Sequence, residues 1–353
     1  SVGSFAPEAD TFLYVYCLEG QEGNDLKEIG MKREALGELE RLLAQADARN
    51  MKKILILNVS APVACAEVME RFDGVLCTFL CGMQGANALS DISAGTVNPS
   101  GKLPLSWPKR VEDMPSYMNF PGDGMTVNYG EGIFVGYRWY DARKIKPLFP
   151  FGFGLSYTEF SLEALTAEQS HFSEEIKLRA VVKNTGSRKG KTVVQIYVAD
   201  EKSTLTKPVK ELKAFQKAEL LPGEEKELSF VLCRHDFESY DENLGQFVME
   251  EGYYRILAGF SAEEIQKECR IYADVTSPYS YGAKTSVKII MEQQELKEVT
   301  KEFFFVFSLK WSYMLTSYEY TAQDTIEKVL AEAGCAEKDK AKLYQQLFAV
   351  KKE

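Results

Sequence analysis

A stretch rich in proline, glycine and aromatic residues, 98–160, limits most strongly what this chain can fold into. It holds seven of the twelve prolines, each of which removes a backbone donor, and its glycines permit turns that other residues cannot make. The stretch is too rich in these residues for a helix or a central strand. Aromatic residues are frequent in this stretch, and clusters of aromatic side chains are rarely left exposed to solvent. We therefore expect an extended strap, pinned over a surface, that joins one domain to the next.

The residues before the strap alternate between short apolar runs and amphipathic segments. Buried strands are expected at 12–17, 54–59 and 74–79, and helices at 31–50, 64–72 and 85–94. This alternation predicts βα units around a mostly parallel sheet with helices on both faces. In such sheets, residues that bind ligands lie mostly in loops after the carboxyl ends of the strands. The loop after the first strand is therefore the candidate location of a functional site.

Beyond the strap, residues 175–274 show the two-residue period of strands. Apolar residues alternate with polar ones around 176–182, 194–198 and 228–232, and turn signals such as 184–186 and 221–223 separate these runs. The pattern predicts an antiparallel β-sandwich of about a hundred residues. No catalytic constellation is visible within it.

Three segments resemble the C-terminal half of glycoside hydrolase family 3, the family of many β-glucosidases: NPSGKLPLSWPK, EGIFVGYRWYD and PLFPFGFGLSYTEF. The resemblance continues to about residue 272. It implies an α/β plus all-β fold, with part of the α/β sandwich domain at 1–108 and a connecting strap at 109–160. A fibronectin type III-like domain would follow at 161–275, and a helical tail, a candidate docking segment, at 276–353.

The loop after the first expected strand contains Glu22-Gly23-Asn24-Asp25, which resembles the E-G-x-D motif of that family. In the family the Glu is the general acid/base, and such an acid needs a raised pKa to protonate the leaving oxygen. The resemblance assigns this role to Glu22, with Glu19 as the alternative because the loop can be aligned with a gap. The family usually has Arg after the Asp, whereas this chain has Leu26. Without the resemblance, a solvated acidic loop is the default interpretation.

The resemblance implies a retaining glycosidase, most plainly a β-glucosidase acting on a glucoside or oligosaccharide. The family's (β/α)8 barrel, which supplies the Asp nucleophile, has no counterpart here, since no stretch reads as eight βα units. The barrel domain is therefore the expected partner, and this chain alone is expected to be catalytically incomplete. The alternative is a non-catalytic scaffold of the same fold that binds carbohydrate or protein. Neither a metal nor another cofactor is expected, and a homo-oligomer is left open.

The formal net charge of -10 argues against a nucleic-acid or anionic-membrane partner. The first residues lack a positive region and a long apolar run, so they do not read as a signal peptide, and we expect a cytoplasmic protein. The seven cysteines are an odd number and several lie in apolar runs, which predicts buried free thiols.

The tail does not match the family pattern. Residues 301–315 are strongly apolar and aromatic but too short, and too charged at their flanks, to span a membrane comfortably, so we expect them to dock on a partner. Residues 321–350 are expected to be helical, with a break near Gly334.

Overall fold

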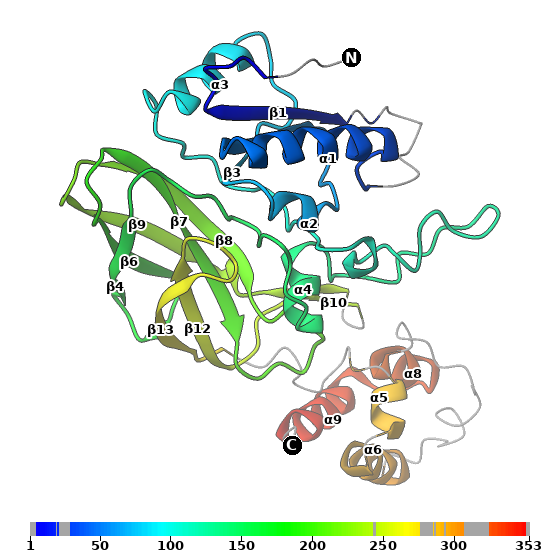
Figure 1. Cartoon of the computed structure of the whole chain (residues 1–353). Helices are drawn as coiled ribbons and strands as arrows, with labels where there is room; N and C mark the ends of the chain where they lie inside the picture. The colour runs from blue at the N-terminus through cyan, green and yellow to red at the C-terminus, as the bar shows by residue number, and fades with distance from the viewer. Residues whose placement is uncertain are drawn as a thin grey trace.

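The computed structural model describes residues 5–18, 20, 29–242, 245–275, 285, 287–292, 294–306 and 325–350. Within these ranges the chain forms an α/β unit, a long connecting strap, a β-sandwich and a group of helices near the C-terminus (Figure 1). This order confirms the predicted fold class of α/β plus all-β with a helical tail.

The α/β unit contains a three-stranded parallel sheet in the order β1-β2-β3. Its elements are β1 (Thr11–Leu18), α1 (Arg33–Ala48), β2 (Lys52–Val59), α2 (Ala66–Met69), β3 (Gly74–Cys77) and α3 (Gly85–Ser93). Strand and helix types agree with the sequence prediction. The second helix is much shorter than expected, because only 66–69 is helical between the loop after β2 and the start of β3.

One face of this sheet packs against α1. Buried leucines of α1, such as Leu39 and Leu43, share a core with Phe12 and Tyr16 of β1 and Leu55 of β2. The opposite face is open at β1, where Leu13 and Val15 are each 51% exposed. The prediction of helices covering both faces is therefore wrong at β1. Parallel sheets are normally buried on both sides, which makes this apolar exposure unusual.

The strap is pinned to the α/β unit at Trp107, which is 1% exposed. Its indole Nε1 donates to the carbonyl of Val63 at 2.8 Å, and its backbone pairs with Phe149. Contrary to the prediction, the strap is not extended throughout: it contains a short 3-10 turn, η1 (Val111–Asp113), and the helix α4 (Tyr137–Arg143). The helix forms because its seven residues contain neither glycine nor proline, although the flanking sequence is rich in both.

The β-sandwich contains all the remaining strands that the structure describes. They are β4 (Phe160–Ala167), β5 (His171–Phe172), β6 (Glu175–Asn184), β7 (Gly190–Asp200), β8 (Glu211–Leu220), β9 (Glu225–Cys233), β10 (Ser239–Asp241), β11 (Gln246–Val248), β12 (Gly252–Gly259) and β13 (Ile265–Ala273). The short 3-10 turn η2 (Arg234–Asp236) lies between β9 and β10. One sheet has the order β4-β6-β9, a second has the order β5-β13-β12-β7-β8, and β10 pairs with β11.

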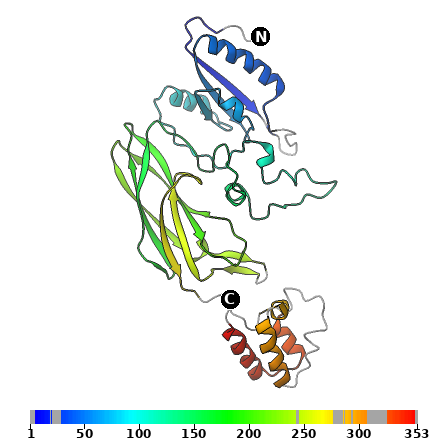
Figure 2. The same cartoon turned by 60° about the horizontal axis from the view of Figure 1, so that its bottom comes forward.

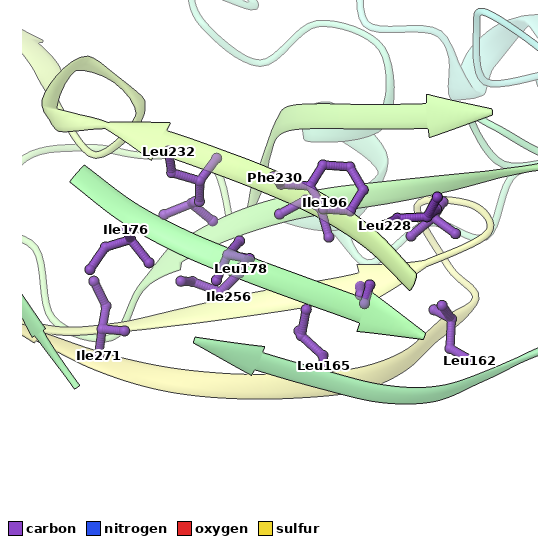
Figure 3. Packing of buried hydrophobic residues seen from close by; sticks show 14 of the residues in the cluster. Leu162, Leu165, Ile176, Leu178, Ile196, Leu228, Phe230, Leu232, Ile256 and Ile271 are labelled. Carbon is purple, nitrogen blue, oxygen red and sulfur yellow. The ribbon is translucent and has the colours of Figure 1, made fainter. Parts of the chain in front are cut away.

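The core of the sandwich lies between the three-stranded and five-stranded sheets. Figure 3 shows Ile176 and Leu178 of β6 pointing toward Ile271 and Ile256, which come from the opposite sheet. All four side chains are nearly or fully buried. The alternation predicted around 176–182 and 228–232 is confirmed in β6 and β9, since every second side chain of these strands enters this core. In β7 all residues of 194–198 are buried, because the strap covers the other face of this strand at Gln195 and Tyr197.

The strap and the sandwich are joined by polar contacts. The Lys210 ammonium pairs with Asp141 of α4 at 2.5 Å, and the backbone N–H of Leu212 donates to the Tyr137 hydroxyl at 2.8 Å. Gly152 has a φ of +81° and lies so close to Gln195 that an added Cβ would come within 2.3 Å of its Nε2. The strap therefore sits directly on the sandwich and leaves no room for a side chain at Gly152.

The C-terminal helices are α5 (Val287–Glu292), α6 (Gln294–Val306), α8 (Ile326–Glu332) and α9 (Glu337–Ala349). They share a small apolar core that includes Phe304, Leu330 and Leu343. The break expected near Gly334 separates α8 from α9. The apolar segment 301–315 begins inside α6 but continues beyond the described residues, so its docking role stays a prediction. Among the helices that the structure describes, none has the length and apolar character needed to cross a membrane.

All seven cysteines are described, and each is a free thiol. Cys65 is buried, but Cys17, Cys81 and Cys233 are exposed. The prediction of buried thiols is therefore wrong for these three. Cys17, for example, lies on the same open face of β1 as Leu13 and Val15.

Candidate functional site

The two candidate catalytic carboxylates, Glu22 and Glu19, lie outside the described residues. The structure describes where their loop leaves the sheet and where the chain returns from it. The loop leaves at Leu18, the last residue of β1; Gly20 is described within it, and the continuous description resumes at Ile29. The loop therefore belongs to the carboxyl edge of a parallel sheet, as the sequence predicts.

The leaving end of the loop is tied to the residue that follows β2. The backbone N–H of Gly20 donates to Ser60 Oγ at 3.0 Å, and Ser60 Oγ donates to the carbonyl of Leu18 at 3.4 Å. A Cβ at Gly20 would lie 3.3 Å from Ser60 Oγ, so the two residues are in close contact. Ser60 thus holds the backbone between the two candidate carboxylates.

The returning end is tied to the same neighbouring loop. The Ala64 N–H donates to the Ile29 carbonyl at 2.8 Å, and Gly30 pairs with Ala64 as a parallel bridge. The Lys32 N–H donates to the Tyr16 hydroxyl at 3.3 Å. Burial raises the pKa of Tyr16, against the opposing effect of this hydrogen bond, so the phenol stays neutral and can accept. Both ends of the loop are therefore anchored next to the carboxyl end of β2.

Sequence reasoning identified the loop but missed its anchors. Ser60 and Tyr16 are ordinary residue types in ordinary positions, and no motif marks them. Their role depends on the side-by-side pairing of β1 with β2, which places Leu18 opposite Val59. Only the folded sheet brings residues 18 and 60 together.

The segment 82–88 leads from the third strand of the sheet into the helix α3. A Cβ at Gly85 would lie 2.2 Å from the Cys81 Cβ, so Gly85 is needed for this close approach. The helix that it opens, α3, has no buried residue.

A second group of carboxylates lies in the sandwich, far along the chain from the loop. Lys207 Nζ pairs with Asp200 Oδ2 at 2.9 Å and approaches Glu250 Oε2 at 3.8 Å, and all three side chains are largely buried. Glu250 also accepts hydrogen bonds from the Ser203 hydroxyl and from the backbone and hydroxyl of Thr204. Burial alone would raise the pKa of Glu250, but these bonds and Lys207 lower it below its ordinary value.

This cluster is built for stability rather than for proton transfer, because Lys207 pairs with Asp200 and the fixed donors around Glu250 favour the charged form of that carboxyl group. It borders an open hollow of about 440 Å³ whose lining includes Leu205 and Arg255. A second hollow of about 670 Å³ lies beside α4 and includes Lys144 and Arg255. Neither lining contains a described end of the loop. Across the described ranges, no three His, Cys, Asp or Glu side chains come together as metal ligands would.

Comparisons with protein families match two parts of the chain. Residues 2–157 match the glycosyl hydrolase family 3 C-terminal domain. Residues 192–262 match the fibronectin type III-like domain. The first match contains the loop, the parallel sheet and the strap, and the second lies inside the sandwich.

The chain is 36% identical over 278 residues to thermostable beta-glucosidase B of Acetivibrio thermocellus. The aligned region covers 75% of this chain and 37% of that protein. Among solved structures it resembles beta-glucosidase 3B of Thermotoga neapolitana in complex with glucose, with a TM-score of 0.70 and 32% identity over 75% of this chain and 38% of the other. A GH3 beta-glucosidase of Bifidobacterium adolescentis has a TM-score of 0.72 and 29% identity over 83% of this chain and 43% of the other. The chain thus spans between 37% and 43% of the length of these three proteins.

Proposed function

Because the chain belongs to the C-terminal portion of glycoside hydrolase family 3, we propose that it is the acid/base-bearing part of a retaining β-glucosidase. The single observation that carries the proposal is the anchoring of the loop 19–28 at the carboxyl edge of the parallel sheet. That edge is where ligand-facing loops of α/β sheets collect. The related proteins are named beta-glucosidases, and one of the similar structures holds glucose.

In this mechanism Glu22 protonates the glycosidic oxygen as the aglycone leaves, while an Asp of the barrel domain attacks the anomeric carbon. Glu22, now a carboxylate, then removes a proton from water, and the water oxygen displaces the Asp from the sugar. The two carboxyl groups of a retaining site stand about 5–5.5 Å apart, so the loop must approach the barrel closely. Glu19 is the alternative acid in the same loop.

The experiment compares Glu22→Gln, Glu19→Gln and Glu28→Gln in the complete enzyme that carries this chain. The substrates are an aryl β-glucoside with a good leaving group and one with a poor leaving group. Loss of the acid should lower kcat by roughly 10²–10⁴-fold with the poor leaving group. With the good leaving group, the rate of the glycosylation step should fall much less, because that group needs little protonation to leave. Glu28→Gln is the matched control within the loop. Undiminished hydrolysis of both substrates by Glu22→Gln would reject the assignment.

Ser60 is a positioning residue in this proposal, because it holds Gly20 between the two candidate acids. Ser60→Ala should lower kcat roughly tenfold with little change in KM, since the loop would sample many positions while the sugar-binding surface stays intact. Ser60→Thr keeps the hydroxyl and should restore most of the rate. If KM rose instead while kcat held, Ser60 would be acting on substrate binding.

The alternative function is a non-catalytic scaffold of the same fold. The observation that favours it is Leu26, which stands where the family usually has Arg. A complete enzyme with no glucosidase activity but with measurable binding of glucosides by calorimetry would support the scaffold.

A further inference from the structure

A long segment of the strap, residues 114–135, leaves the body of the molecule between η1 and α4, and we call it the arm (Figure 1). The arm concentrates exposed apolar side chains to an unusual degree. The most exposed are Met125, Met118 and Tyr129, at 103%, 87% and 81%, and Phe120 is 52% exposed. Single exposed apolar residues are normal on a protein surface, but a cluster of large ones marks an interaction site.

The arm has a defined internal structure. The Phe120 N–H donates to the Ser116 carbonyl at 2.9 Å, and Asp123 and Thr126 exchange backbone hydrogen bonds at 3.1 Å. The Asn119 amide reaches Glu131 across the arm at 3.4 Å. A segment already ordered loses less conformational entropy on binding, so this construction favours docking.

The base of the arm is held to the strap by side chains. The Trp139 indole donates to the Asp113 carbonyl at 3.1 Å, and Arg110 pairs with the Asp113 carboxylate at 2.7 Å. The direction in which the arm leaves the molecule is therefore fixed by α4 and η1. In both views the arm extends on the side of the molecule where β1 ends (Figures 1 and 2).

We propose that the arm docks on the (β/α)8 barrel domain of the same enzyme, inserting Met118, Met125 and Tyr129 into an apolar groove beside the catalytic loop. This inference rests on the proposed function, which places the barrel over the carboxyl edge of the sheet. The arm lies wholly inside the family 3 domain match at 2–157. The related β-glucosidase is matched over only 37% of its length, so most of such an enzyme remains to supply the groove.

The chemistry of the arm fits a protein groove better than the other occupants. Methionine side chains adapt their shape to irregular apolar surfaces, and tyrosine places a polar tip at the rim. Asp123 and Glu131 of the arm, and the chain's net charge of -10, oppose an anionic membrane and association with a second copy. A groove with a basic rim is the complementary surface.

The test measures binding of the full chain to a separately purified barrel domain, taken from the unmatched region of the Acetivibrio thermocellus relative. The arm variant is Met118→Ser/Met125→Ser/Tyr129→Ser. Its matched control is Phe215→Ser/Leu221→Ser/Val231→Ser, which replaces three exposed apolar side chains of the sandwich. Because all six side chains are exposed, both variants should keep the parent's circular dichroism. The arm variant should bind the barrel roughly tenfold or more weakly, and the control should bind like the parent.

Equal affinity of the arm variant, or no complex with the parent chain, overturns the proposal. Sedimentation of the chain alone provides a second measurement. If the parent chain forms a dimer and the arm variant does not, the arm binds a second copy of the chain, and the proposal is overturned. Glu22→Gln separates this proposal from the proposed function. It should remove glucosidase activity of the complex while leaving the affinity unchanged, and an active Glu22→Gln complex rejects the acid/base role but not the arm.

Discussion

Replacing Lys207 by Met should destabilise the sandwich strongly, because this lysine lies between two buried carboxylates. The side chains of Asp200 and Glu250 are each 7% exposed, and the Lys207 side chain is 11% exposed. Methionine fills a similar volume, so the change removes the charge and little packing. Breaking a buried ion pair by removing one partner costs about 3–5 kcal/mol. Glu250 keeps three hydrogen bonds from Ser203 and Thr204, which places the expected loss near the lower end, at about 3 kcal/mol.

Hydrogen exchange of the amides in β7 and β12, followed by mass spectrometry at pH 7, measures this loss within the sandwich alone. Asp200 is the last residue of β7, Glu250 lies just before β12, and the two strands pair with each other. A loss of about 3 kcal/mol corresponds to a decrease in protection of roughly a hundredfold. Lys202→Met is the matched control, because Lys202 is an exposed lysine in the same loop and should change the free energy of unfolding by less than about 0.5 kcal/mol.

The loss should also depend on pH with a defined sign. The pKa of Glu250 is lowered from its ordinary value of 4.5, so its contribution to stability is present above pH 4.5 and is lost as the pH falls further. The difference between parent and Lys207→Met should therefore be largest at neutral pH and should shrink below pH 4.5. Urea denaturation at pH 7 and at lower pH tests this. A loss below about 1 kcal/mol, or one that is equal at both pH values, would refute the reasoning.

Two further predictions concern the strap and the cysteines. Gly152→Ala should lower the free energy of unfolding by about 2 kcal/mol or more, because the new Cβ would meet the buried Gln195 amide. Gly132→Ala, also at positive φ but with open space around it, should lower it by about 1 kcal/mol. The urea midpoints of the two variants test this difference. Iodoacetamide at pH 8 should label exposed Cys81 and Cys233 well before Cys65, since burial raises the pKa of the Cys65 thiol to about 12, and rapid labelling of Cys65 in peptide mass spectra would contradict this.

The sequence was a good guide to the type of each element and a poorer guide to exposure. The alternation in β6 and β9 was readable because one face of each strand is buried and the other is not. The same rule failed for β1, whose apolar residues Leu13 and Val15 look buried in the sequence but face the open side of the sheet. Hydrophobicity states what a side chain prefers, and only the packing of neighbouring elements decides whether it is covered.

The helix α4 was missed for a related reason. Its residues, Tyr137–Arg143, lie between glycine-rich and proline-rich flanks, and the composition of the whole strap concealed a short permissive run. A helix of about two turns gains little from its own propensity. It is held by contacts with the sandwich, such as the ion pair of Asp141 with Lys210.

For the candidate site, the sequence alone determined the loop, the motif around Glu22, and the βα order that places such a loop at the carboxyl edge of a sheet. These follow from local patterns, because strand period and turn residues act over a few positions. Only the tertiary structure decided that Ser60 and Ala64 anchor the loop, that Lys207 neutralises two buried carboxylates, and that the arm stands out with its methionines exposed. Each of these depends on residues distant in the chain meeting in space, or failing to meet, and no local pattern records that outcome.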